Sequence, residues 1–498
     1  MPADCLIGID IGTQSVRALL IDRRSHLRIL AFRPTPTLRP APDRAEHDPE
    51  ALWQAVLEVL REVGAQVPPG RAVAGMAVAS VGESCVLLDD RGQPLANAVA
   101  WFDRRTEEDA AWLAARLSPE RLFAVTGLAP DPTYTLCKLL WSRRTMPDRF
   151  APARSMLNIA DYIAFRLCGE AATDFSLASR TSCLDLADRR WSSELLDAVG
   201  LDRTLLPPIR ASGTRLGTVR PGVLAATGLS GRPSVGVGAH DHVCGAFAVG
   251  GLADGILLDS MGTAEALLTS VRQPAMTPAL VERGCFQGAV ERDQPLFYLG
   301  ATITSSGGAV EWARALFGGS LSRQALIDEA GRVPPGSNGV SYLPELAAAA
   351  SSPASPAPGA AFLGLTPAKG AGEMFRAVLE GLAIAAAGIV EGMPAFAEVG
   401  KPREIIVIGG NTRNRLLLEI KASAYGRPMT INAEPEATAL GAALMGGIAA
   451  GLWPDLGQAL REVERQEFVV DPRPAWIPIY RELSRTAHAG LHPLPPRS

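Results

Sequence analysis

A glycine-containing turn near the N-terminus has the residue types of a phosphate-binding loop. Residues 8–15 read Gly-Ile-Asp-Ile-Gly-Thr-Gln-Ser. Glycine lets backbone N–H groups approach an anion, Thr13 and Ser15 can donate hydroxyl hydrogen bonds to phosphate, and Asp10 can hold a hydrated Mg²⁺. A Walker loop would instead need Gly-Lys and then Ser or Thr after a longer glycine loop. Taken alone, the pattern also fits an ordinary hairpin turn.

Two further segments repeat the change from an apolar run to glycine. Residues 258–264 read Leu-Asp-Ser-Met-Gly-Thr-Ala, and residues 406–411 read Ile-Val-Ile-Gly-Gly-Asn. The first again combines glycine with hydroxyls, so turns from two duplicated domains could hold phosphate from both sides. The second opens into a glycine pair, where an adenine ring could lie flat against the backbone.

Asp241 follows a glycine-rich run, Val235-Gly-Val-Gly-Ala-His240. A carboxylate in this position can accept the proton of an attacking hydroxyl. The alternative is a structural one, in which Asp241 only caps the following helix. His240 and His242 stand beside it, but with no cysteine or third histidine nearby they do not form a zinc site.

Strands and helices of ordinary length must position these turns. Strands are predicted over 6–11, 16–22, 73–78, 86–89, 256–261 and 405–408. Helices are predicted over 49–63, 105–117, 307–317, 373–390 and 416–425, the first behind the capping residue Asp48. The chain therefore reads as α/β.

The length, charge and cysteine content of the chain indicate a globular protein that binds small molecules. A chain of 498 residues exceeds the roughly 250–300 residues of one core, so two domains are expected, with a boundary near residue 245. The net charge of −4 provides no positive field for nucleic acid or an anionic membrane. Seven scattered cysteines without a C-x-x-C pair indicate free thiols, and neither a signal peptide nor a membrane span is recognisable. We expect a cytoplasmic protein.

The three glycine turns, in this order, resemble the ATPase core shared by actin, heat-shock chaperones and sugar kinases. The likeness then narrows to the FGGY carbohydrate kinases. It rests on Ala360, Phe362, Gly364-Leu365, Glu373-Met374 and the run 377–380, and on Lys138-Leu139 with Trp141. The resemblance implies two ribonuclease-H-like α/β domains with an interdomain cleft. Residues 1–245 would hold the sugar, the first phosphate loop and the catalytic aspartate, and residues 246–498 would bind ATP.

The resemblance also implies a role for individual residues. Asp241 would be the catalytic base and would touch the substrate, and Asp10 would bind the metal. The remaining sugar contacts would be Glu83, Trp101, Asp103 and Tyr134. The ATP contacts would be Gly12, Thr13, Gln14, Gly262, Thr263, Gly307, Gly410 and Asn414.

Several of these residues have simpler structural alternatives. Trp101 by itself fits a core position as well as a sugar platform, and Lys138 fits packing or an ion pair. Glu434 and Glu436 fit first-turn carboxylates beside a helix dipole. The Ala/Ser/Pro tract 347–361 replaces a Gly-Glu-Arg-like family stretch and is predicted to be a mobile surface loop.

The function expected from the resemblance is ATP-dependent phosphorylation of a hydroxyl on a small sugar, with Mg²⁺ as cofactor. The substrate stays open among pentuloses such as xylulose, hexuloses, polyols and sugar acids, and Glu83 with Asp103 favours a neutral one because carboxylates repel an acid. A homodimer is possible. The alternative is a sugar sensor that keeps the kinase fold without turnover. A chaperone-type ATPase would need a further substrate-binding domain.

Overall fold

The N-terminal glycine turn joins two long antiparallel strands, as the apolar runs on either side of it predict. These strands belong to a six-stranded sheet. In spatial order its strands are β12 (Arg215–Thr218), β13 (Ser234–His240), β6 (Ala72–Ser80), β1 (Ala3–Ile11), β2 (Ser15–Asp22) and β3 (Arg28–Pro34). β13, β6 and β1 are parallel, and the two strands at one side and the single strand at the other are antiparallel. The carboxyl ends of β1, β6 and β13 therefore meet at one edge of the sheet.

Helix α1 (Pro49–Gly64) covers one face of this sheet. It begins at Asp48, whose carboxylate accepts hydrogen bonds from the backbone N–H groups of Glu50 and Ala51, as the sequence predicts. Its apolar residues recur at helical spacing and pack against β2 and β3. Together with the alternate residues Ile7 and Ile9 of β1 they form one buried core.

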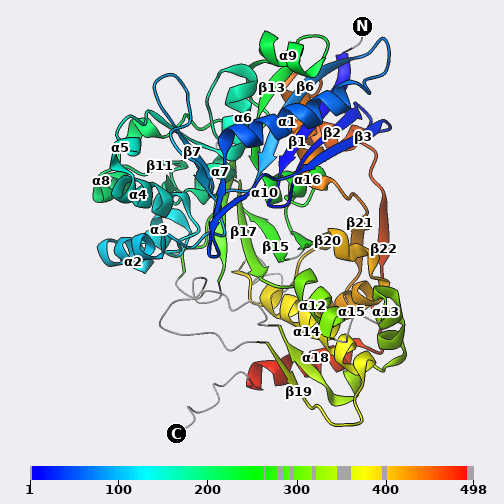
Figure 1. Cartoon of the computed structure of the whole chain (residues 1–498). Helices are drawn as coiled ribbons and strands as arrows, with labels where there is room; N and C mark the ends of the chain where they lie inside the picture. Colours follow the sequence, from blue (N-terminus) through cyan, green and yellow to red (C-terminus); the bar gives the residue numbers. More distant parts are fainter. Residues whose placement is uncertain are drawn as a thin grey trace. The chain divides into compact units, whose positions relative to one another are not determined.

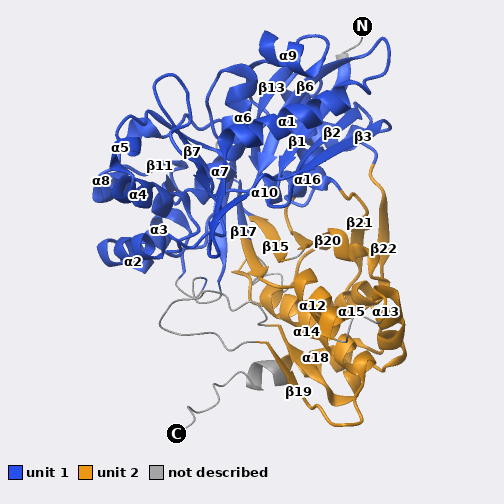
Figure 2. Ribbon diagram, in the orientation of Figure 1, with its two compact units in different colours: residues 1–252, 271–299, 436–464 blue, residues 253–270, 300–435, 465–498 orange. Residues whose placement is uncertain are grey.

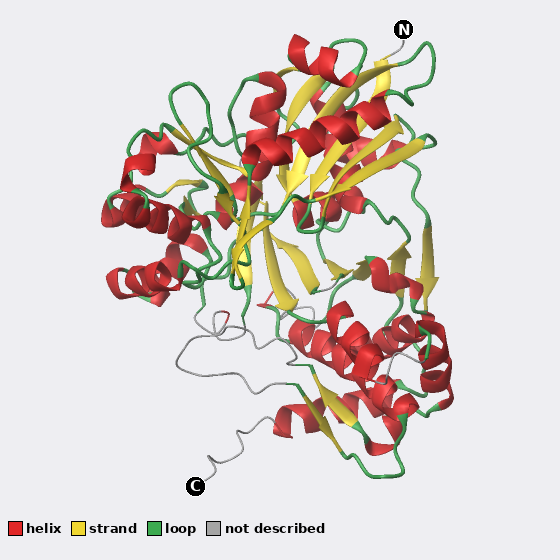
Figure 3. Cartoon of the chain, viewed as in Figure 1, coloured by secondary structure: helices red, strands yellow, loops and turns green. Residues whose placement is uncertain are grey.

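Helix α16 (Ala437–Ala449), from near the end of the chain, covers the opposite face (Figure 1; Figure 3). It lies against β1, β6 and β13, with α10 (Asp241–Ala248) beside it. The approach is very close because glycine stands where side chains would collide. A Cβ atom on Gly8 would lie 1.7 Å from the carbonyl oxygen of Ala439, and one on Gly75 would lie 2.1 Å from that of Gly446. Gly8 therefore serves helix packing.

We expect Gly8→Ala to lower the stability of the protein by about 1–3 kcal/mol, because the added methyl group overpacks a rigid backbone contact. Gly222→Ala is the matched control, since a Cβ there would meet no atom within 4 Å. The measurement is the denaturant midpoint of unfolding for both variants. An unchanged midpoint in Gly8→Ala would contradict the packing seen between β1 and α16.

A mainly helical region follows the first three strands of the sheet. Its helices are α2 (Glu107–Arg116), α3 (Pro119–Thr126), α4 (Thr135–Thr145), α5 (Pro147–Phe150), α6 (Ile159–Cys168), α7 (Phe175–Arg180), α8 (Ser193–Val199) and α9 (Pro221–Thr227). Its short strands are β4 (Leu38–Ala41), β5 (Arg44–His47), β7 (Cys85–Leu88), β8 (Ala98–Val99), β9 (Ser155–Asn158), β10 (Leu184–Asp185) and β11 (Arg190–Trp191). Most of these helices share a second buried core.

The second half of the chain repeats the strand pattern of the first. Its sheet begins with β16 (Phe286–Glu291) and β17 (Leu296–Ile303). The five strands that follow them in spatial order are β15 (Glu265–Val271), β14 (Ile256–Met261), β20 (Glu404–Ile408), β21 (Met429–Asn432) and β22 (Glu467–Val470). The pairs are antiparallel, parallel, parallel and antiparallel, as they are for β2, β1, β6, β13 and β12. The predicted α/β class with two duplicated parts is confirmed.

The helices of this half pack mainly against one another. They are α12 (Gly307–Leu316), α13 (Arg323–Arg332), α14 (Ala371–Glu391), α15 (Arg415–Tyr425) and α18 (Ile477–Gly490). The other elements of this half are the paired strands β18 (Ser341–Leu343) and β19 (Ala361–Leu363) and helix α17 (Leu456–Glu462). Predicted and observed bounds differ by one or two residues at most ends, as expected where helices fray.

The chain divides into two compact units that are not continuous in sequence (Figure 2). Unit 1 comprises 1–252, 271–299 and 436–464, and unit 2 comprises 253–270, 300–435 and 465–498. The structure describes residues 3–262, 264–277, 280, 284–291, 296–316, 321–344, 360–394 and 401–490. Most of the tract 347–361 lies outside these residues. Within them, no helix has the length and apolar content needed to cross a membrane.

Candidate active site

The turn between β1 and β2 is fixed by contacts with its own backbone and with a neighbouring loop. The Gly12 N–H donates to the Ser15 carbonyl oxygen at 3.0 Å, and the Thr35 hydroxyl donates to the Gly12 carbonyl oxygen at 2.7 Å. The Thr35 N–H donates to the Gln14 carbonyl oxygen at 3.0 Å. The Thr13 hydroxyl accepts a hydrogen bond from the Trp101 indole at 2.9 Å. The predicted phosphate turn and one predicted sugar contact are thus joined directly.

Asp241 begins helix α10 at the carboxyl end of β13. Its side chain is 22% exposed, and its Oδ1 accepts a hydrogen bond from the His242 N–H at 2.6 Å. The capping position of α10 is His240, whose side chain makes no capping hydrogen bond, and Asp241 follows it in the first turn. His240 Nδ1 lies 3.3 Å from the same oxygen, and burial lowers the pKa of His240 to about 3, so this imidazole is neutral. The Asp241 carboxylate is thus held in place and open to a ligand.

Asp10 lies beside Asp241 at the same edge of the sheet. Burial and then the negative charge of Asp241 raise the pKa of Asp10 to about 7. The Oδ1 atom of Asp10 is buried and has no hydrogen-bond partner among the described residues. A buried carboxylate oxygen without a partner next to a second carboxylate is the donor chemistry that a hard divalent cation satisfies. In the described part of the chain, no three histidine, cysteine or acidic side chains gather as a metal site.

The start of α16 brings two residues to this place that sequence reasoning did not assign. Glu436 accepts a hydrogen bond from Arg17 at 3.0 Å, and the Thr438 hydroxyl donates to the Asp241 carbonyl oxygen at 3.4 Å. The charges of Arg17 and Glu436 act on the pKa of Asp10 in opposite directions. Glu436 was interpreted only as a carboxylate near a helix dipole, because nothing in the sequence indicated which sheet this helix covers.

Glu83 forms a buried ion pair that sequence reasoning missed. Its Oε1 lies 2.5 Å from the Nε atom of Arg180, and the two side chains are 5% and 14% exposed. Gly82 allows this arrangement, because a Cβ there would lie 2.8 Å from His240 and 3.1 Å from Arg180. The pair is therefore next to the histidine that precedes Asp241.

Aromatic rings enclose the Arg180 guanidinium. Its carbon lies 5.1 Å from the ring centre of Tyr134 and 5.1 Å from that of Phe286. Its Nη1 atom is buried with no hydrogen-bond partner among the described residues, as is the hydroxyl of Tyr298. Burial raises the pKa of Tyr134 to about 12, so its hydroxyl keeps its proton. Arg180 ends a short helix with no apolar periodicity, so the sequence held no signal for it.

Asp103 has a different environment from the one predicted. Its side chain is fully buried, and Arg105 donates to both of its oxygens, at 2.9 and 2.7 Å. The Ala45 N–H donates to Oδ2 at 2.6 Å. Both oxygens are therefore already used inside the protein. Trp101, by contrast, is 37% exposed and is not a core residue.

The predicted nucleotide contacts of unit 2 gather around Gly262. Its carbonyl oxygen accepts hydrogen bonds from the Gly307 N–H at 3.1 Å and from Asn411 Nδ2 at 3.4 Å. A Cβ on Gly307 would lie 2.5 Å from that oxygen, so glycine is required there. Asn411 was quoted in the glycine motif but not predicted as a site residue. Thr263 lies outside the described residues.

Gly410 has an open backbone face, whereas the side chain of Asn414 is used to cap a helix. A Cβ on Gly410 would meet no atom within 4 Å, so this backbone presents a free face. The preceding Gly409 has φ 104° and packs on Met261, a position that only glycine adopts readily. The Asn414 side chain caps α15 by accepting from the Leu417 N–H at 3.2 Å.

A buried charged network lies behind the Gly262 turn. Lys421 Nζ is 2.5 Å from Asp259 Oδ2 and 2.5 Å from Glu265 Oε1, and all three side chains are at most 1% exposed. The Ser306 hydroxyl donates to Glu265 Oε2 at 2.7 Å. The network therefore ties both strands of the β14–β15 hairpin to α15 and to the residue before Gly307.

Comparison with known protein families identifies two adjoining domains. Residues 5–248 match the N-terminal domain of the FGGY family of carbohydrate kinases, and residues 257–450 match its C-terminal domain.

Individual relatives and solved structures agree with these matches. The chain is 32% identical over 463 residues to a glycerol kinase of Trichlorobacter lovleyi, covering 90% of this chain and 91% of that protein. It is 30% identical over 446 residues to a xylulose kinase of Escherichia coli strain K12, covering 89% and 90%. The crystal structure of xylulose kinase from Rhodospirillum rubrum superposes with a TM-score of 0.87 at 28% identity, covering 98% of this chain and 99% of that one.

Proposed function

Since this chain belongs to the FGGY family of carbohydrate kinases, it phosphorylates an alcohol group of a small sugar with ATP, and we propose that Asp241 is the base of that reaction. The observation that carries the proposal is the place of Asp241, a partly exposed carboxylate at the sheet edge beside Asp10 and one residue after His240. A base that takes the proton of the attacking hydroxyl needs such a fixed and accessible oxygen.

Phosphoryl transfer depends mainly on alignment and on neutralising charge. Asp241 would hold the hydroxyl through its carboxylate and receive its proton. The turn would present the backbone N–H groups of Thr13 and Gln14 and the Thr13 hydroxyl to phosphate oxygens, with Gly12 shaping the turn through its bond to Ser15. Gly262, Gly307, Gly410 and Asn414 would serve the nucleotide, supported by the close glycine contacts around Gly262.

Mg²⁺ fits the chemistry of Asp10. The buried Oδ1 without a protein partner would hold the ion, directly or through its water shell. Bound with ATP, the ion supplies positive charge that offsets the phosphate oxygens. Asp10 itself would keep that charge near Asp241.

The sugar would be bound by Glu83 together with Arg180, between Tyr134 and Trp101. Glu83 accepts from sugar hydroxyls, and the guanidinium donates to sugar oxygens. Since Arg180 already balances the charge of Glu83 and Arg105 balances that of Asp103, these carboxylates do not select against a sugar acid. We assign the sugar and the base to residues 1–245 and the nucleotide to residues 246–498, which the two family matches support.

The test is a panel of pentuloses, hexuloses, polyols and sugar acids assayed by coupled ADP release. We expect one class to be phosphorylated, and Glu83→Gln to raise the KM for that sugar by roughly 10-fold or more, as expected for loss of a hydrogen bond to a charged group. The KM for ATP should stay within twofold.

Glu58→Gln is the matched control, because Glu58 forms only a surface ion pair with Arg33. It should leave both KM values unchanged. Binding of a sugar without ADP release would support the alternative of a sensor without turnover. Equal rises of both KM values in Glu83→Gln would show that Glu83 does not belong to the sugar pocket.

A further inference from the structure

Glu83 has a backbone conformation that must be held in place. Its φ is 66°, in the left-handed region that non-glycine residues seldom occupy. Such a conformation is unfavourable for a residue with a side chain and persists only where neighbours enforce it. Because the side-chain direction follows from the backbone, whatever holds this residue also aims its carboxylate.

Helix α4 supplies the groups that hold the Glu83 backbone. The Glu83 carbonyl oxygen accepts a hydrogen bond from the Thr135 hydroxyl at 3.1 Å and a second from Lys138 Nζ at 3.1 Å. The Lys138 ammonium also donates to the carbonyl oxygen of Thr133, which directly precedes Tyr134. One buried ammonium thus joins the loop of Glu83 to the loop of Tyr134.

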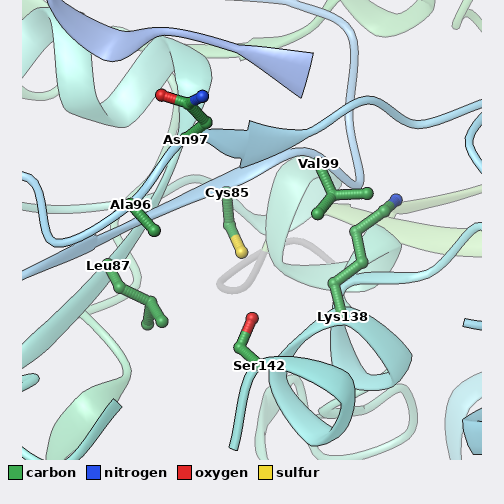
Figure 4. Close-up of a pocket in the computed structure, with 7 residues that line it drawn as sticks. All are labelled: Cys85, Leu87, Ala96, Asn97, Val99, Lys138 and Ser142. Atoms are coloured by element: carbon green, nitrogen blue, oxygen red, sulfur yellow. The ribbon is translucent and has the colours of Figure 1, made fainter. Parts of the chain in front are cut away.

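The other side of Lys138 offers no room for a sugar. A cavity of about 10 Å³ lies there, no more than one water molecule could occupy (Figure 4). Cys85 and Ser142 line it, and the Lys138 ammonium is directed away from both of them. Lys138 therefore acts through the two carbonyl groups that it binds.

We propose that Lys138 is a positioning residue for sugar binding, whose ammonium holds Glu83 and the loop of Tyr134 in the geometry that the sugar requires. The inference rests on the proposed role of Glu83. It predicts that the KM for the sugar depends on the charge of Lys138 while the KM for ATP does not.

The charge of Lys138 can be changed by pH, because burial lowers its pKa to about 8. The neutral amine would make weaker hydrogen bonds, since charge assistance roughly doubles their strength. The groups that face it are Glu83, Cys85, Asp103, Cys137 and His47. Burial raises the pKa of both thiols to about 12, and the pKa values of His47 and Asp103 are lowered, so none of these four changes charge between about pH 7 and 9.

Loss of stability would not imitate this effect. The folded state binds fewer protons at Lys138 than the unfolded state between the folded pKa of about 8 and the ordinary 10.5. The contribution of this group to stability therefore rises with pH in that window. An increase of the sugar KM above pH 8 would therefore reflect a change in the sugar site and not unfolding of the protein.

The experiment measures the KM for the sugar and for ATP in the wild-type protein, Lys138→Met, Lys138→Arg and Thr135→Val. We expect Lys138→Met to raise the sugar KM by roughly 10- to 100-fold, the scale of a lost hydrogen bond to a charged group. The wild-type sugar KM should increase several-fold between pH 7 and 9. Lys138→Arg, which keeps its charge in this range, should give a profile that is flat with pH.

Ser142→Ala is the matched control, because Ser142 lies on the same helix and lines the same cavity without binding either loop. It should leave both KM values unchanged. A wild-type sugar KM that is flat from pH 7 to 9, or equal rises of both KM values in Lys138→Met, would overturn the proposal. If Lys138→Met does not fold, the wild-type pH profile still decides. A wild type that phosphorylates no sugar would refute the proposed function instead.

Discussion

Asp241→Asn should lower the rate of sugar phosphorylation by roughly 10²- to 10⁴-fold, the range that general-base catalysis contributes. The amide cannot accept the proton that the attacking oxygen loses. Its carbonyl oxygen can still accept the hydrogen bond from the His242 N–H, and the side chain is partly exposed, so the fold should persist. The measurements are turnover and calorimetric binding of sugar and ATP on one preparation.

The control for this variant is Asp188→Asn, an exposed carboxylate paired only with Arg190 at the surface. It should turn over sugar at the wild-type rate. Near-normal turnover in Asp241→Asn would remove Asp241 as the base. If the variant loses its fold and no longer binds sugar or ATP, the carboxylate of Asp241 is needed for structure instead.

Lys421→Met should destabilise the protein by about 3–5 kcal/mol, the cost of leaving buried charges without their partner. The substitution removes the cation of a network in which the carboxylates of Asp259 and Glu265 are buried with it. Thermal unfolding at two pH values measures the effect. The partly exposed Lys369, whose ammonium donates to the Asn338 carbonyl oxygen, supplies the matched control Lys369→Met.

The pH dependence of this variant has a definite sign. Burial and then the charge of Asp259 raise the pKa of Glu265 to about 7 from its ordinary 4.5. Because its pKa is raised, Glu265 keeps its proton to a higher pH in the folded state than in the unfolded state. The contribution of Glu265 to the free energy of unfolding therefore falls as the pH rises between these two pKa values. Removing the Lys421 charge raises the pKa further, so the loss should be larger near about pH 8 than near about pH 5.5. The same loss at both values would contradict the network as described.

The local pattern of the sequence was enough to place the strands and the main carboxylates. Alternating and continuous apolar runs predicted β1, β2 and β14 closely, and the strand-to-glycine changes located Asp10 and Asp241 at strand ends. The position of a strand end depends on residues that are close together in the chain, so it can be predicted from a single sequence. The roles of these residues in catalysis stay predictions.

Contacts between distant segments could not be predicted in this way. Arg180 was missed because its partner Glu83 lies 97 positions away, and an arginine at a helix end usually faces solvent. Asp103 was interpreted as a sugar contact from the family resemblance, whereas its burial with Arg105 depends on packing that the sequence does not show. Glu380, which lies in a family signature, is likewise buried with Arg376 and Tyr480.

The discontinuous make-up of unit 1 has a consequence for synthesis on the ribosome. The sheet that starts at β1 is complete once β13 has been made, but its second face waits for α16, which follows the residues of unit 2 from 300 to 435. At roughly 5–20 residues per second this delay lasts on the order of ten seconds. During that time α16 does not yet cover the backbone at Gly8, Gly75 and Gly236. Unit 1 can therefore finish folding only after α16 has been synthesised, by which time residues 253–435 of the chain have been made as well.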